Sequence, residues 1–158
     1  MAIEFETFKM PYYRAIPLGL DPESWVMLEG FIPRQSKGFY VDFAYGQFLG
    51  ASIPLRFQLS FEGLHSSSTA VIALNTFTEG HWGKPNRVAA HLRRGQRFQV
   101  QFIVTSKGYK IIENDIFLCD FDHQLSPKRI RFLEMDGDII LENITFSWES
   151  STRSRRLL

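Results

Sequence analysis

The chain has 158 residues, which is enough for one domain that buries its own core. Hydrophobic residues make up 44% of it and aromatic residues 15%, and the abundance of Phe favours strands over helices. The 18 lysines and arginines nearly balance the 17 aspartates and glutamates. The resulting net charge of +1 excludes a general attraction to nucleic acid or to an anionic membrane surface.

The single cysteine, Cys119, excludes an intrachain disulfide and is typical of a protein made in a reducing compartment. Three charged residues, Glu4, Glu6 and Lys9, interrupt the start of the chain where a secretory signal would need an apolar run. No segment reaches the ~20 apolar residues of a membrane-spanning helix. We therefore expect a cytoplasmic protein that does not insert into membranes.

Breaks rich in glycine and proline recur roughly every eight to twelve residues, which is the spacing of an all-β domain. Between them lie short runs rich in Val, Ile and Phe, and we predict strands at Phe39–Phe43, Leu55–Phe61, Phe98–Phe102, Ile139–Leu141 and Ile144–Trp148. In the second run every other residue is apolar and faces a core. The residues between them, Arg56, Gln58 and Ser60, then point to the opposite side.

Two antiparallel sheets packed face to face account for this alternation, and a closed β-barrel accounts for it equally well. No internal repeat or linker divides the chain, so we predict one domain over residues 1–149. Residues 150–158 form a short basic tail with Arg153, Arg155 and Arg156, which we expect to be disordered.

Three stretches carry a family resemblance and keep their order along the chain. In the middle stretch, Asn75 stands seven residues before Trp82-Gly83, and Arg87 follows. The flanking stretches are Pro11-Tyr12, Leu18-Gly19-Leu20 and Leu28-Glu29-Gly30 on one side, and Phe121-Asp122-His123, Ile130 to Leu133 and Gly137-Asp138 on the other. Over residues 11–148 the sequence resembles the galectins. The resemblance implies a two-sheet antiparallel jelly-roll sandwich with a glycan-binding groove on its concave sheet.

The galectin resemblance also implies roles for single residues. Trp82, which lies beside a turn with Gly80 and Gly83, would be exposed and would stack on the apolar face of a sugar. Asn75 and Arg87 would bind the hydroxyl groups of that sugar. Galectins add a His, an Asn and an Arg at alternate positions of one strand, and a Glu after the Trp. The matching positions here hold Arg56, Gln58, Ser60 and Pro85.

These replacements predict a glycan-binding module with altered specificity, because each unpaired sugar hydroxyl costs about 1 kcal/mol or more. Arg56 and Arg87, with no signature carboxylate nearby, would favour an acidic or sulfated glycan. The alternative is that Arg56 pairs with a local acidic residue such as Glu79. In a different functional class, a galectin-fold protein that has lost sugar binding would act through protein contacts or as a structural homodimer.

Motifs for other chemistry are missing from the sequence. The histidines His65, His81, His91 and His123 lack the spacing of a zinc site. The chain has no nucleophile motif of the GxSxG type and no phosphate-binding glycine loop. The sequence therefore predicts no metal, no cofactor and no enzymatic activity. The resemblance implies cytoplasmic synthesis, with export that needs no signal peptide.

Overall fold

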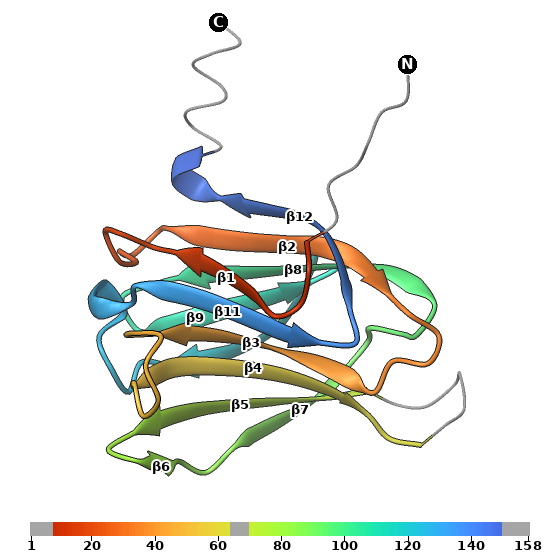
Figure 1. Cartoon of the computed structure of the whole chain (residues 1–158), viewed down its shortest axis with the longest axis horizontal. Helices are drawn as coiled ribbons and strands as arrows, with labels where there is room; N and C mark the ends of the chain where they lie inside the picture. Colours follow the sequence, from red (N-terminus) through yellow and green to blue (C-terminus); the bar gives the residue numbers. More distant parts are fainter. Residues whose placement is uncertain (1–7, 64–69, 150–158) are drawn as a thin grey trace, which may run out of the picture.

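The computed structural model describes residues 8–63 and 70–149, which form two antiparallel β-sheets (Figure 1). The seven-stranded sheet has the order β1-β11-β3-β4-β5-β6, with β7 also paired to β5. Its strands are β1 (Tyr12–Ala15), β11 (Phe132–Gly137), β3 (Gly38–Ala44), β4 (Ile53–Phe61), β5 (Ala70–Thr78), β6 (His81–Trp82) and β7 (Asn86–Ala90). The five-stranded sheet runs in the order β10 (Ile116–Asp122), β9 (Gly108–Glu113), β8 (Gln96–Val104), β2 (Trp25–Ile32) and β12 (Ile140–Phe146).

The two sheets are open, since no strand within the described residues belongs to both. The predicted sandwich is therefore confirmed, and the closed barrel is not formed. One 3-10 turn, η1 (Pro127–Arg129), precedes β11. In the described part of the chain, no helix has the length and apolarity needed to cross a bilayer. The predicted basic tail over 150–158 lies outside the described residues.

Burial along β4 follows the predicted alternation. Leu55, Phe57 and Leu59 are almost completely buried, and the residues between them lie on the outer face of the seven-stranded sheet. Across the core, Phe57 packs edge-on against Phe102 of β8, with ring centroids 5.3 Å apart. A fully buried Phe side chain stabilises the fold by up to about 3 kcal/mol. The apolar half of β4 thus ties one sheet to the other and leaves its polar half on the surface.

The last strand differs from its prediction. The two runs expected at 139–141 and 144–148 form one continuous strand, β12, paired with β2. An irregularity in its register between Leu141 and Asn143 shifts the alternation, which makes one strand look like two in the sequence. The expected end at Trp148 is wrong, because the strand ends at Phe146.

One carboxylate is buried in this fold at an energetic cost. Glu113, the last residue of β9, is 2% exposed, and its Oε1 accepts a hydrogen bond from the His91 backbone N–H at 2.6 Å. Its Oε2 has no partner among the described residues. Burial raises the pKa of Glu113 above its usual value, although the bond from His91 partly opposes the shift. A carboxyl with a raised pKa in the folded state favours folding when protonated and disfavours it when ionised.

We expect Glu113→Gln to raise the free energy of unfolding at pH 7.5 by on the order of 1 kcal/mol, because the amide oxygen keeps the His91 bond without a buried charge. The wild-type contribution is present below the unfolded pKa and is lost as the pH rises through the raised folded pKa. Urea unfolding of both proteins from pH 5 to 8 measures this, and the advantage of the variant should grow with pH. The exposed Glu62→Gln serves as control. A pH-independent difference would contradict the assignment.

Candidate functional site

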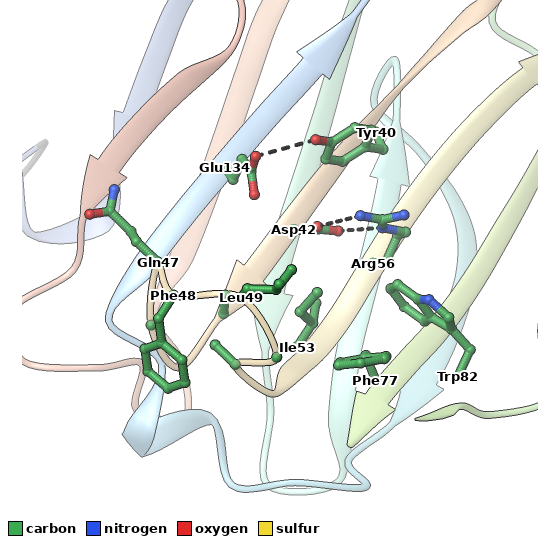
Figure 2. A pocket seen from close by; sticks show the side chains of 14 residues that line it. Tyr40, Asp42, Gln47, Phe48, Leu49, Ile53, Arg56, Phe77, Trp82 and Glu134 are labelled. Atoms are coloured by element: carbon green, nitrogen blue, oxygen red, sulfur yellow. Dashed lines mark hydrogen bonds and ion pairs between the residues drawn. The ribbon is translucent and has the colours of Figure 1, made fainter. Parts of the chain in front are cut away.

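The outer face of the seven-stranded sheet carries a hollow of about 500 Å³ beside Trp82 (Figure 2). Strand register builds it, because Asp42 of β3 lies opposite Arg56 of β4, and Arg56 lies opposite Asn75 of β5. The two-residue strand β6 pairs Trp82 with Phe77 at the end of β5. Facing pairs on one side of a sheet are close enough for direct contact. Side chains from β3, β4, β5, β6 and β11 therefore meet here.

Arg56 is held in the hollow by four contacts. Its Nε and Nη2 donate to Oδ1 and Oδ2 of Asp42, each at 2.7 Å. Its guanidinium carbon lies 4.4 Å from the centroid of the Tyr40 ring and 4.6 Å from that of the Trp82 ring. Figure 2 shows Arg56 between these two rings. A bidentate ion pair and two cation–π contacts hold the guanidinium in one orientation.

The ion pair is shielded from water on the carboxylate side. The Asp42 side chain is 1% exposed, whereas that of Arg56 is 27% exposed. Burial raises the pKa of Asp42, and the hydrogen bonds and charge of Arg56 oppose this shift only in part, so the pKa remains raised. Burial lowers the pKa of Arg56, but its hydrogen bonds to Asp42 and the negative charge of Asp42 outweigh this effect and leave the pKa raised. The cation thus stays charged and is neutralised by its partner.

A second carboxylate, Glu134 of β11, lies opposite Asp42 in the strand register and within reach of Tyr40. The Tyr40 hydroxyl donates to Glu134 Oε1 at 3.3 Å. Burial, helped by the negative charge of Glu134, raises the pKa of Tyr40 to about 12, so the hydroxyl remains a donor at neutral pH. The hollow therefore holds one paired cation and two carboxylates.

Trp82 forms the rim of the hollow. Its side chain is 42% exposed, and it packs against Phe77 with ring centroids 5.1 Å apart and an interplanar angle of 54°. Asn75 supports the turn behind it, because Nδ2 donates to the Gly83 carbonyl at 2.9 Å. The Asn75 Oδ1 also accepts from the Thr76 N–H at 2.8 Å. The expected exposure of Trp82 is confirmed, but one part of its ring lies under the Arg56 guanidinium.

Comparison with known proteins assigns the chain to a family. The family model of galactoside-binding lectins matches residues 11–146. The chain belongs to the galectin family. It is 31% identical over 138 residues to Galectin-4 of Rattus norvegicus, which covers 87% of this chain and 41% of that protein. It is 30% identical over 131 residues to Galectin-7 of Mus musculus, covering 82% and 92% of the two chains. The chain thus spans about two fifths of the galectin-4 relatives and nearly all of galectin-7.

Solved structures agree with this membership. Sheep galectin-11, described in complex with glycerol, superposes with a TM-score of 0.75 at 27% identity and covers 86% of this chain and 96% of its own. A variant of human galectin-16 superposes with a TM-score of 0.77, covering 89% and 97%, but at 17% identity it supports the fold alone. The resemblance seen in the sequence is confirmed, and the chain carries a galectin carbohydrate-binding domain.

The galectin signature positions do not all reach the hollow. Arg56 and Trp82 line it, and Asn75 holds the turn of Trp82 from behind. Gln58 is the next outward-facing residue of β4 after Arg56. In the cross-strand row of Gln58, Ala73 of β5 lies between it and Arg87 of β7. Both Gln58 and Arg87 are exposed, and neither side chain makes a hydrogen bond or ion pair to the described residues. Ser60 is another row away, opposite Val71.

The charge expected at this face needs correction. Without the signature carboxylate, a groove made basic by Arg56 and Arg87 is expected from the sequence, but Asp42 pairs with Arg56 and Glu134 stands beside Tyr40. The alternative, that Arg56 pairs with a local acidic residue, is confirmed, with Asp42 as the partner in place of Glu79. The alternation of the strand at 39–43 already put Asp42 on one side with Tyr40. Only the pairing of β3 with β4 brings that side to Arg56.

We expect Arg56→Ala to destabilise the fold by about 2 kcal/mol, because it leaves the Asp42 carboxylate buried without a partner. This destabilisation is smaller than that from breaking a fully buried ion pair, because Arg56 is partly exposed. Adding Asp42→Asn to Arg56→Ala should restore at least half of the free energy of unfolding that Arg56→Ala loses. Urea unfolding of the two single variants and the double variant measures this coupling. A double variant as unstable as Arg56→Ala would show that the lost ring contacts, not the unpaired charge, cause the effect.

Proposed function

We propose that this galectin domain binds a glycan in the hollow beside Trp82, with a specificity that differs from that for ordinary β-galactosides. The observation that carries the proposal is the exposed Trp82 ring next to donors and acceptors held in fixed positions. An aromatic ring buries the apolar face of a sugar, and this contact contributes roughly 1–2 kcal/mol. Fixed polar groups then select among hydroxyl patterns, since they need no reordering when the ligand binds.

The polar groups of the hollow suit hydroxyls, which both donate and accept. Arg56 uses Nε and Nη2 on Asp42, and its Nη1 has no partner among the described residues. This nitrogen supplies donors to a ligand. The Glu134 carboxylate supplies acceptors, because two carboxylate oxygens have more lone pairs than the hydroxyls of Tyr40 and Tyr13 beside it use. Gln58 and Arg87 extend the same face by one row and supply further donors, with Ser60 beyond them.

Altered specificity follows from where Arg56 lies. Its guanidinium covers part of the Trp82 ring, so a sugar reaches only the rest of that ring. Gln58 and Ser60 differ in length and donor geometry from the residues that galectins carry at these positions. A β-galactoside would therefore lose several of its usual partners, each worth about 1 kcal/mol or more.

The charge of the hollow favours a neutral glycan over the acidic or sulfated one expected from sequence. Asp42 already neutralises Arg56, and Glu134 repels an anion. Arg87 is the remaining cation of the signature, and it lies outside the hollow. An anionic ligand would share a guanidinium whose charge Asp42 already neutralises.

The same cover on Trp82 favours a second candidate function. A hollow that Arg56 partly fills fits a galectin domain that no longer binds sugar and acts through protein contacts or as a structural homodimer. The two candidates differ in one observable, which is whether Trp82 contributes to the binding of any glycan.

We expect a glycan array to show binding to neutral glycans that falls at least tenfold in Trp82→Ala, which matches the loss of about 1.4 kcal/mol of stacking. Trp148→Ala, a change at a similarly exposed tryptophan far along the chain, should leave binding intact. Circular dichroism checks that each variant is folded. Hits confined to sulfated or sialylated glycans would favour the acidic ligand, and no binding by folded wild type would favour the protein-contact function.

A further inference from the structure

The hollow beside Trp82 has two unlike sides. Figure 2 shows Glu134, Asp42 and Arg56 along one side, and Leu49, Ile53 and Phe77 along the other. The first side presents charged and hydrogen-bonding groups, and the second presents aliphatic and aromatic carbon. Both border a single cavity, so one bound molecule would contact both.

The apolar side includes a loop with a defined shape. The loop between β3 and β4 is closed at its base by a bond from the Tyr45 N–H to the Ser52 carbonyl at 2.9 Å. Its tip is a turn in which the Ala51 N–H donates to the Phe48 carbonyl at 3.1 Å. Gly50 has a φ of 90°, which a glycine adopts without strain. The backbone thus holds residues 48 and 49 at the edge of the cavity.

The two side chains at the loop tip are both large and apolar, yet both are exposed. Phe48 is 71% exposed and Leu49 is fully exposed, although each borders the cavity. Keeping such side chains in water forgoes the favourable free energy of burying their apolar surface. Exposed apolar side chains gathered at a cavity mark a ligand site more often than isolated ones do. Here they continue the apolar surface of Ile53 and Phe77.

On the basis of the glycan-binding function proposed above, we propose that the ligand is a glycan carrying an apolar alkyl or acyl substituent beside its sugar ring. The substituent packs against Leu49 and Ile53, while the hydroxyls of the ring meet Arg56 and Glu134. A plain polar sugar would leave the apolar side in water. A wholly apolar molecule would strip water from Glu134 without replacing its hydrogen bonds.

Matched pairs of methyl and hexyl β-glycosides of galactose, glucose and N-acetylgalactosamine, with 1-hexanol as the sugar-free probe, test this proposal by calorimetry. Partial burial of the hexyl chain should make the hexyl glycoside of the preferred sugar bind about tenfold more tightly than its methyl glycoside. In Leu49→Ser the advantage of the hexyl over the methyl glycoside should fall to threefold or less. Leu18→Ser makes the same change at an exposed leucine outside the cavity and should keep the full advantage.

The outcomes separate this proposal from the glycan-binding function itself. Equal affinities for methyl and hexyl glycosides in the wild type would overturn the apolar substituent and leave glycan binding in place. An advantage that survives Leu49→Ser would do the same. Binding of 1-hexanol as tight as that of the hexyl glycosides would overturn both, because the sugar would then contribute nothing. Failure of every pair to bind would also overturn the apolar substituent.

Discussion

The contacts of the hollow depend on the packing of β4 against the opposite sheet. Phe57 lies edge-on to Phe102 in the core, and successive side chains of a strand point to opposite faces. Burying Phe57 therefore turns Arg56 outward, toward β3 and β5. A slip of one residue in this strand would bury the arginine and expose the phenylalanine. The free energy of the core thus holds the register on which the site depends.

The pair of Arg56 and Asp42 gives the hollow its chemical character. A buried carboxylate needs a partner, and the bidentate bond meets that need while holding the guanidinium flat between two rings. The cation is fixed in place and neutralised, so it acts as a rigid donor and not as a free positive charge. It also covers part of Trp82. A rigid guanidinium favours selective glycan binding, whereas a partly covered Trp82 ring disfavours it. The same contact therefore supports both candidate functions, glycan binding and protein contacts.

The asymmetry of the hollow adds a second character to this face. Its polar side comes from three neighbouring strands, whereas much of its apolar side comes from the loop between β3 and β4 and from the end of β5. Loops vary more readily than the strands that carry them. A change at the loop tip would therefore alter the apolar side of the hollow and leave the sheet intact. In this galectin, that tip carries Phe48 and Leu49.

Much of this arrangement was predictable from residues close together in the sequence. The period of two in 55–61 placed Arg56, Gln58 and Ser60 on the outer face. The exposure of Trp82 was expected from the family resemblance together with the glycines beside it. The family resemblance supplied the sandwich, which periodicity left open. The sequence did not reveal the partners of Arg56 and Tyr40. Asp42 is 14 residues from Arg56, and Glu134 is 94 residues from Tyr40.

The sequence by itself determined which side chains face the core and which face solvent, because that choice depends on a local period and on the burial of apolar groups. Only the tertiary structure decided which outward side chains meet. Strand order and register bring Asp42 to Arg56 and Glu134 to Tyr40, and the loop after β3 brings Leu49 to the same cavity. Pairing between distant strands is a property of the whole sheet, so the charge and shape of the hollow appear only once the sheet is assembled.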